Sequence, residues 1–201
     1  MKVGIDFGGV IVKPADGNHF FDSNLGLDIE QPNAIATIAY LIAVLDVEVW
    51  IVSKASVSTQ KQTRAWLNLV DFYSKTNFHP ANLRFCAKRS EKIDICRELE
   101  IEYFLDDTLE VLEYMEGGVP NRYLFGKESN SHEIVSVESW DNFLQSVSGK
   151  TIVMKELISK LPVLESSYAK GLEAVMIARK GLVYHCFSSY KRFLNYYHIY
   201  L

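Results

Sequence analysis

The chain has 201 residues, of which 48% are hydrophobic and 23% are charged. This composition fits one folded domain with a full core, and it excludes extensive disorder, a collagen repeat and a disulfide-rich scaffold. With 21 basic and 25 acidic side chains the net charge is −4, so the overall field does not attract nucleic acid. Asp6 interrupts the first apolar run, and no run reaches the about 20 apolar residues that span a bilayer. We therefore expect a cytoplasmic protein without a membrane partner.

Short β-rich runs alternate with helical patterns through the first three quarters of the chain. We expect strands in the ranges 2–6, 47–52, 83–86, 102–105 and 122–125, and helices in the ranges 34–45, 58–70, 91–99, 108–115 and 140–147. This rhythm predicts an α/β domain with a three-layer, Rossmann-like architecture, in which helices cover both faces of a mainly parallel sheet. The domain is expected to occupy residues 1–149.

Residues 150–201 are expected to form a separate, helix-prone extension. Large apolar side chains, nearly all aromatic, recur in it at intervals of three and four residues: Tyr184, Phe187, Tyr190, Phe193, Leu194, Tyr197 and Tyr200. A stripe of this kind at helical spacing is typical of a core or an interface. Three roles stay open for the extension: packing on the first domain, covering its site as a lid, or forming a homodimer contact.

The three cysteines are far apart and include no CxxC pair. This spacing argues against a zinc ribbon and against a disulfide staple, and it agrees with a reducing compartment. Cys86 and Cys96 fall in predicted elements, where a free cysteine usually behaves as a small core residue.

Polar side chains stand where several of the predicted strands end. Asp6 closes the first β-rich run, Ser53 follows the second, and Asp106 and Asp107 follow the fourth. Because the carboxyl ends of parallel strands share one edge, and open α/β sheets bind ligands at that edge, we expect these side chains to lie together. Carboxylates placed close together repel one another and favour a hard cation with oxygen ligands, such as Mg²⁺.

Glycine and lysine residues complete this pattern. Gly8 and Gly9 come directly after the first acid, and glycine lets the backbone approach a bound oxyanion closely. Lys54 stands beside the hydroxyl of the second strand, and Lys92 opens the helix before the fourth strand. Hydroxyl and ammonium groups can hold phosphoryl oxygens, and a carboxylate nucleophile can form an aspartyl-phosphate. The pattern therefore favours Mg²⁺-dependent phosphoryl transfer.

Four motifs, in their order and spacing, resemble those of the haloacid dehalogenase-like (HAD) phosphohydrolase superfamily over roughly residues 1–148. The matching segments are GIDFGGVIV, VWIVSK, KRSEKIDICREL and YFLDDTLEVL. The resemblance implies a Mg²⁺-dependent phosphatase that acts on a phosphorylated small molecule or macromolecule. The intervals 12–47 and 53–92 are too short for an inserted cap, so the resemblance is to capless members of the superfamily.

The resemblance also implies a role for each matching residue. The nucleophile would be Asp6, assisted by Ser53 and Lys92, which hold and neutralise the transferring phosphoryl group. The phosphate contacts would come from Gly8, Gly9, Ser53, Lys54 and Lys92, with Lys88 and Arg89 as alternatives to Lys92. The Mg²⁺ ligands would be Asp6, the Gly8 carbonyl, Asp106 and Asp107.

One position departs from the superfamily pattern. Phosphatases of this kind usually carry a second aspartate two residues after the nucleophile, as the general acid and base, and here that position is Gly8. General acid–base catalysis typically contributes about 10² to 10⁴ in rate. A slow phosphatase is therefore the first hypothesis, and the alternative is a degenerate domain that binds a phosphorylated ligand or partner without turnover.

A third hypothesis comes from the segment GIDFGG, which also resembles the first phosphate loop of actin-like sugar or acyl kinases. That fold needs two large lobes, and its first strand continues into further strands. This chain is short for two lobes and predicts a helix at 34–45, which makes the kinase hypothesis the weakest of the three.

Overall fold

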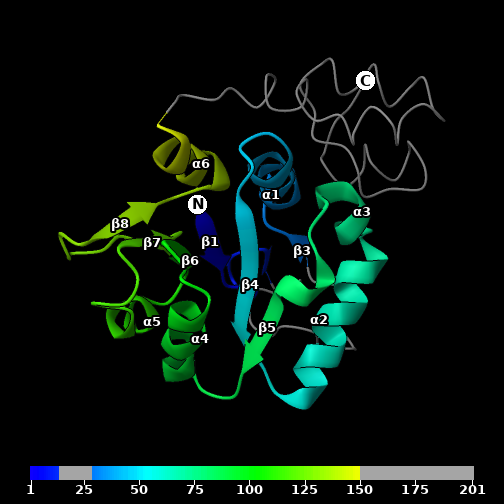
Figure 1. Ribbon diagram of the computed structural model, residues 1–201, viewed down its shortest axis with the longest axis horizontal. Coiled ribbons are helices and arrows are strands. Elements are labelled where there is room, and N and C mark those ends of the chain that lie inside the picture. The colour runs from blue at the N-terminus through cyan, green and yellow to red at the C-terminus, as the bar shows by residue number, and fades with distance from the viewer. Residues whose placement is uncertain (14–28, 150–201) are drawn as a thin grey trace.

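The computed structural model describes residues 1–13 and 29–149. At its centre is a six-stranded sheet in the order β5-β4-β1-β6-β7-β8, and all neighbouring strands pair in parallel (Figure 1). The strands of this sheet are β1 (Lys2–Ile5), β4 (Glu48–Lys54), β5 (Leu83–Cys86), β6 (Tyr103–Asp106), β7 (Asn121–Phe125) and β8 (Ile134–Val137). A short antiparallel pair, β2 (Val12–Lys13) and β3 (Ile29–Glu30), stands apart from it.

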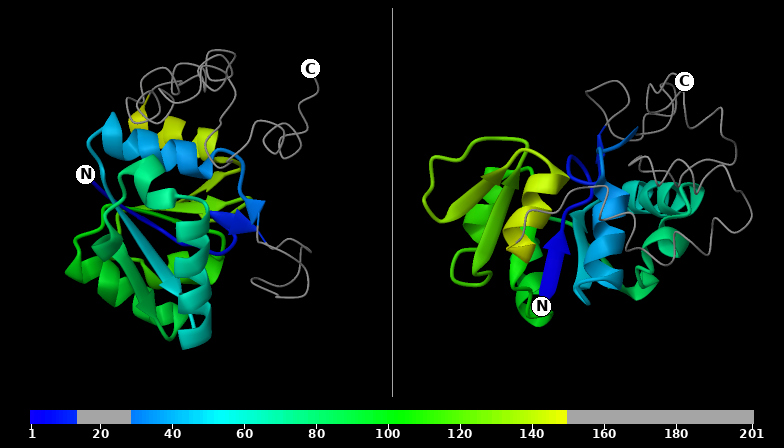
Figure 2. Two further views of the ribbon diagram at one scale, coloured as in Figure 1. Left: turned by 90° about the vertical axis from the view of Figure 1, so that its right-hand side faces the viewer. Right: turned by 90° about the horizontal axis from the view of Figure 1, so that it is seen from above.

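Helices cover both faces of the sheet (Figure 2). They are α1 (Ala34–Ala43), α2 (Val57–Leu69), α3 (Phe72–Thr76), α4 (Lys92–Glu98), α5 (Leu109–Tyr114) and α6 (Trp140–Ser148), with 3-10 turns η1 (Pro80–Asn82) and η2 (Arg89–Glu91). Apolar side chains of α1, α2, α3 and α6 share one buried cluster with β1. Those of α4 and α5 form a second cluster on the other face. The predicted three-layer α/β class is therefore confirmed.

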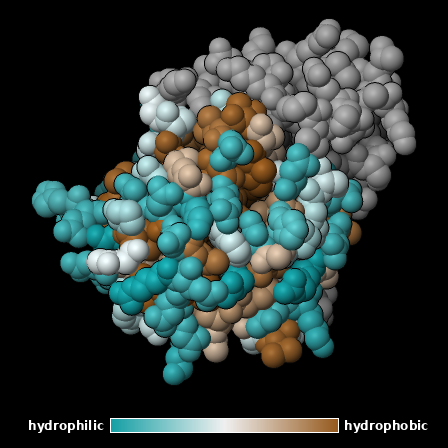
Figure 3. All heavy atoms as spheres, in the orientation of Figure 1, coloured by the Kyte–Doolittle hydropathy of each residue, from teal (hydrophilic) through white to brown (hydrophobic). Residues whose placement is uncertain are grey.

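The strand β4 illustrates why the sheet is buried on both sides. Val49 and Ile51 belong to the first cluster, whereas Val52 belongs to the second and Trp50 packs against it. Alternate side chains of one strand thus enter two cores, as a parallel strand covered by two layers of helices requires. The outer surface is mainly hydrophilic in the view of Figure 3, which agrees with this placing of the apolar side chains.

The structure differs from the sequence prediction in three places. The short antiparallel pair of β2 and β3 was not predicted. A second helix, α3, follows α2, so that residues 54–92 hold two helices rather than one. The sixth strand, β8, was not predicted, and only its two end residues are buried.

No separate cap appears in residues 54–92, all of which are described, because Trp66, Leu67 and Phe72 of this interval are part of the first cluster. The other interval includes residues 14–28, which lie outside the described residues. So does the predicted extension at 150–201, and its boundary and roles stay predictions. Within the described residues, no helix is both long enough and apolar enough to cross a membrane.

Candidate active site

The two central strands bring the first and fourth motifs together. Ile5 of β1 is in register with Leu105 of β6, and the Asp6 backbone N–H donates to the Leu105 carbonyl at 2.9 Å. Asp6 and Asp106 therefore leave neighbouring strands at the same level. Asp106 is completely buried, while Asp6 retains 9% of its exposure.

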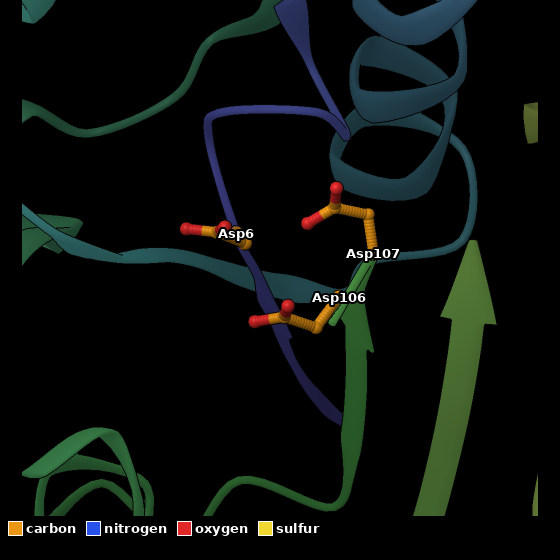
Figure 4. Close-up of side chains that lie close together, drawn as sticks. All are labelled: Asp6, Asp106 and Asp107. Carbon is orange, nitrogen blue, oxygen red and sulfur yellow. The ribbon is translucent and has the colours of Figure 1, made fainter. Parts of the chain in front are cut away.

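Three carboxyl groups converge at this edge of the sheet. Asp6, Asp106 and Asp107 each offer an oxygen, and these three oxygens all lie within 4.8 Å of one another. Figure 4 shows the three groups pointing to the same side of the strand ends. The predicted ligand set is thus assembled by adjacent strands, with the Thr108 N–H donating to Oδ1 of Asp106 at 2.9 Å.

A buried lysine lies among these acids. The Nζ atom of Lys92, at the start of α4, is 2.6 Å from Oδ2 of Asp106 and 3.0 Å from Oδ1 of Asp6. Burial lowers the pKa of Lys92, but the two carboxylates outweigh burial and hold this pKa above its ordinary value. Burial and the neighbouring Asp6 raise the pKa of Asp106 to about 7, although Lys92 and the Thr108 N–H act in the opposite direction. The ion pairs with Lys92 offset the cost of burying charged carboxylates at this site.

A cavity of about 250 Å³ opens over the acids. One wall comes from the strand ends and the other from α2 and η2. Its lining is polar apart from one aromatic ring and comprises Asp6, Phe7, Gly8, Ser53, Lys54, Thr59, Thr63, Arg89, Lys92, Asp107 and Thr108. Most of the predicted site residues therefore meet in one cavity, with Asp106 buried beneath them.

Gly9 has a different role from the predicted phosphate contact. Its N–H donates to the Val12 carbonyl at 2.8 Å, so this donor is already used within the turn. Its φ is +83°, and a Cβ atom built at this position would overlap the Asp107 carboxylate. Gly9 is therefore needed because Asp107 packs against its bare Cα atom.

The three basic residues of the third motif take different positions relative to the acids. Lys92 reaches the acids, Arg89 lines the cavity, and Lys88 is exposed and does not line it. Two further lining residues, Thr59 and Thr63, were not singled out from the sequence. They stand four residues apart in α2 and so share one helix face. The helix is rich in polar residues, so this spacing gave no distinctive signal in the sequence.

Comparison with known proteins identifies the fold. No family model matches the sequence, and no curated protein matches it either. The structure is similar to that of D,D-heptose 1,7-bisphosphate phosphatase from B. bronchiseptica, which was solved in complex with magnesium and phosphate. The TM-score is 0.58 and the sequence identity is 14%, and the match covers 74% of this chain and 99% of that chain. The corresponding phosphatase from Burkholderia thailandensis gives a TM-score of 0.52 and 13% identity over the same shares of the two chains. The chain has a HAD-like fold.

The HAD-like fold removes the actin-like kinase hypothesis. In that hypothesis the first strand continues into further strands of the same sheet. Here β1 pairs in parallel with β4 and β6, which lie far from it in sequence. Among the described residues, the short β2 pairs with β3 and makes one further bridge, from Val12 to Gly8, and it is not part of the main sheet.

The cluster of three acids fits a hard divalent cation. All three side-chain donors are carboxylate oxygens, and their spread of at most 4.8 Å is close to the size of a coordination shell, because Mg²⁺ bonds oxygen at about 2.0–2.1 Å. Mg²⁺ commonly takes one or two carboxylates and keeps several waters. Asp6, Asp106 and Asp107 can therefore hold the ion that the sequence predicted.

Proposed function

We propose that the domain is a Mg²⁺-dependent phosphohydrolase that cleaves phosphate esters through an aspartyl-phosphate on Asp6. The observation that carries this proposal is the position of the Asp6 carboxylate. It lies at the edge of a polar cavity, within 4.8 Å of two further acids and 3.0 Å from a buried ammonium group. The likeness to a phosphatase that binds magnesium and phosphate supports the same reading.

In the proposed reaction a carboxylate oxygen of Asp6 attacks phosphorus, and the bond from phosphorus to the leaving oxygen breaks. The leaving oxygen takes the bonding electron pair and must then gain a proton. Water next attacks the phosphorus of the aspartyl-phosphate, which releases inorganic phosphate and restores Asp6. Each step is an in-line displacement, so positioning and charge stabilisation carry most of the catalysis.

The chain's own residues divide this work. Lys92 keeps the attacking carboxylate oriented and offers positive charge beside the phosphoryl oxygens. Ser53, from the end of β4, faces the cavity and can donate a hydroxyl hydrogen bond to one of these oxygens. A Mg²⁺ ion held by Asp6, Asp106, Asp107 and the Gly8 carbonyl would neutralise phosphoryl charge as the nucleophile approaches.

The alternative of ligand binding without turnover rests on one observation. Among the described residues that line the cavity, the only carboxylates are Asp6 and Asp107, and both belong to the proposed nucleophile and metal site. No further acid in this part of the chain stands ready to protonate the leaving oxygen. The domain would then hold a phosphorylated ligand or partner, with the same contacts but without hydrolysis.

An assay with an activated aryl phosphate distinguishes the two functions. We expect the full chain with Mg²⁺ to hydrolyse p-nitrophenyl phosphate, Asp6→Asn to fall to the background rate, and excess EDTA to abolish activity until Mg²⁺ is restored. Asp46→Asn is the matched control, because Asp46 is exposed, lies outside the cavity and has φ +52°, which asparagine tolerates. Wild-type activity no higher than that of Asp6→Asn would favour the binding function instead.

A further inference from the structure

Asp107 is contacted by a lysine that no sequence motif singled out. Lys127 follows β7, one residue after the turn at Gly126, and its Nζ donates to the backbone carbonyl of Asp107. The same Nζ lies 3.6 Å from Oδ2 of the Asp107 carboxylate. The hydroxyl of Thr108 is 3.2 Å from the other oxygen, Oδ1, and donates to it. Both carboxylate oxygens therefore have a partner outside the acidic cluster.

The opposite side of Asp107 is closed by the turn after β1. The carboxylate packs against the Cα atom of Gly9, where even a methyl group would overlap it. Asp107 is thus confined between Gly9, Thr108 and Lys127, in the orientation that brings it within 4.8 Å of Asp6 and Asp106. Three separate segments of the chain fix this one side chain.

Lys127 itself stays outside the cavity. It is absent from the residues that line the cavity, and its side chain is 58% exposed. An ion pair this exposed contributes little to folding stability. Its two contacts to Asp107 therefore point to a role in the site rather than in the fold.

We propose that Lys127 is a positioning residue, which orients Asp107 toward Asp6 and Asp106 and thereby strengthens the binding of a divalent cation by the three acids. This inference rests on the metal site of the proposed function. Outer partners that orient a metal ligand typically contribute about 10- to 100-fold in metal affinity. Lys127 donates to the backbone carbonyl of Asp107 as well as pairing with its carboxylate, so one of its two contacts does not depend on the carboxylate.

An opposing effect has to be weighed, because a lysine close to the acids also repels a cation. The Nζ atom is exposed, and water and salt screen charges at such positions strongly. Orientation by a hydrogen bond to the backbone is not screened in this way. We therefore expect the orienting effect to exceed the repulsion, and the difference between variants to persist at high salt.

The test is calorimetric titration of the full chain with Mg²⁺ at low and at high salt. Lys127→Met should weaken binding by about 10-fold or more, and Lys127→Arg should restore most of the loss because the charge and the donors return. Lys61→Met is the matched control, since Lys61 is an exposed lysine of α2 outside the cavity. Its affinity should equal that of the wild type.

Thermal unfolding in EDTA supplies a second measurement. If Lys127 positions Asp107, the metal-free Lys127→Met protein should melt as the wild type does. Mg²⁺ binding by Lys127→Met that equals or exceeds that of the wild type would overturn the inference and leave the proposed function intact. A loss of Mg²⁺ affinity together with a lower metal-free melting temperature would also overturn the inference, and it would likewise leave the proposed function intact. Wild-type protein that binds no Mg²⁺ would overturn both.

Discussion

Lys92 bridges Asp6 and Asp106, with its Nζ atom 3.0 Å from the first carboxylate and 2.6 Å from the second. The side chain of Lys92 is only 2% exposed and Asp106 is fully buried, so this pair of charges is shielded from water. A buried pair of this kind is costly to break, because the remaining partner is left as an uncompensated charge. The same contacts keep the carboxylate of Asp6, the proposed nucleophile, beside the ammonium group of Lys92.

Replacing Lys92 should therefore affect stability and catalysis together. We expect Lys92→Met to lower the free energy of unfolding by about 3–5 kcal/mol in the absence of metal, because two carboxylates lose their counter-ion. Urea denaturation in EDTA measures this change, and the aryl phosphate assay measures the loss of activity. The matched control is Lys88→Met, since Lys88 is exposed and contacts none of the three acids. Equal stability of the two variants would show that the Lys92 pair does not support the fold.

The thiols of the described core give a prediction about pH. Burial raises the pKa of Cys86 to about 11 and that of Cys96 to about 12. The thiolate is the reacting species, so at pH 8 its fraction in the folded protein should be about 100-fold or more below that of an ordinary thiol. As the pH rises above about 9, the unfolded state should lose thiol protons first, and stability should fall.

Iodoacetamide labelling at pH 8 measures this protection. A Cys186→Ser variant restricts the reaction to Cys86 and Cys96. Their labelling should be slow in the native protein and fast in urea. Native labelling at the rate of the unfolded chain would contradict the burial of these two side chains.

The sequence allowed the convergence of the main candidate site residues to be predicted because of a general property of parallel sheets. Asp6, Ser53 and Asp106 each stand at the carboxyl end of a strand, and parallel pairing brings these ends to one edge. Knowing which strands are neighbours in the sheet was then enough to predict that these residues lie close together. Lys92 could be placed because it opens the helix that leads into β6.

Other features depend on packing that no local pattern records. Lys127 reaches Asp107 only because β7 pairs with β6, and its loop position carries no chemical signature. Gly9 was expected to serve an oxyanion, whereas its contact with Asp107 joins residues far apart in the chain. The edge strand β8 escaped prediction because only Ile134 and Val137 are buried, too few for a period-two pattern.

The close contact between Gly9 and Asp107 leads to a paired mutational test. Gly9→Ala and Gly117→Ala each place alanine at a positive φ, +83° and +68°, so each should lose about 1–2 kcal/mol of stability. Only the Gly9 variant would push a methyl group into a carboxylate, because the space around Gly117 is open. Asp107 would have to turn aside and lose its contacts to Thr108 and Lys127, but an ion pair as exposed as that with Lys127 contributes little to folding stability.

Activity should therefore separate the two alanine variants where stability does not. We expect Gly9→Ala to require more Mg²⁺ for half-maximal phosphatase activity and Gly117→Ala to need as much as the wild type. The measurement is a Mg²⁺ titration of the aryl phosphate rate, after urea denaturation has shown matched stabilities. Equal Mg²⁺ requirements would mean that the position of Asp107 is not important for the metal site.

Gly8 provides the last prediction, because it stands where a general acid would be expected beside Asp6, the proposed nucleophile. An aryl leaving group departs without a proton, whereas an alkoxide needs one, so the wild type should hydrolyse aryl phosphates far faster than alkyl phosphates. Gly8→Asp should raise the alkyl rate by about 10-fold or more and narrow this gap. Gly8→Asn is the control, since it has nearly the same size and no acid, and it should leave the ratio of the two rates unchanged. A ratio near one in the wild type would show that another group already supplies the proton, and Gly8 would then not limit the enzyme.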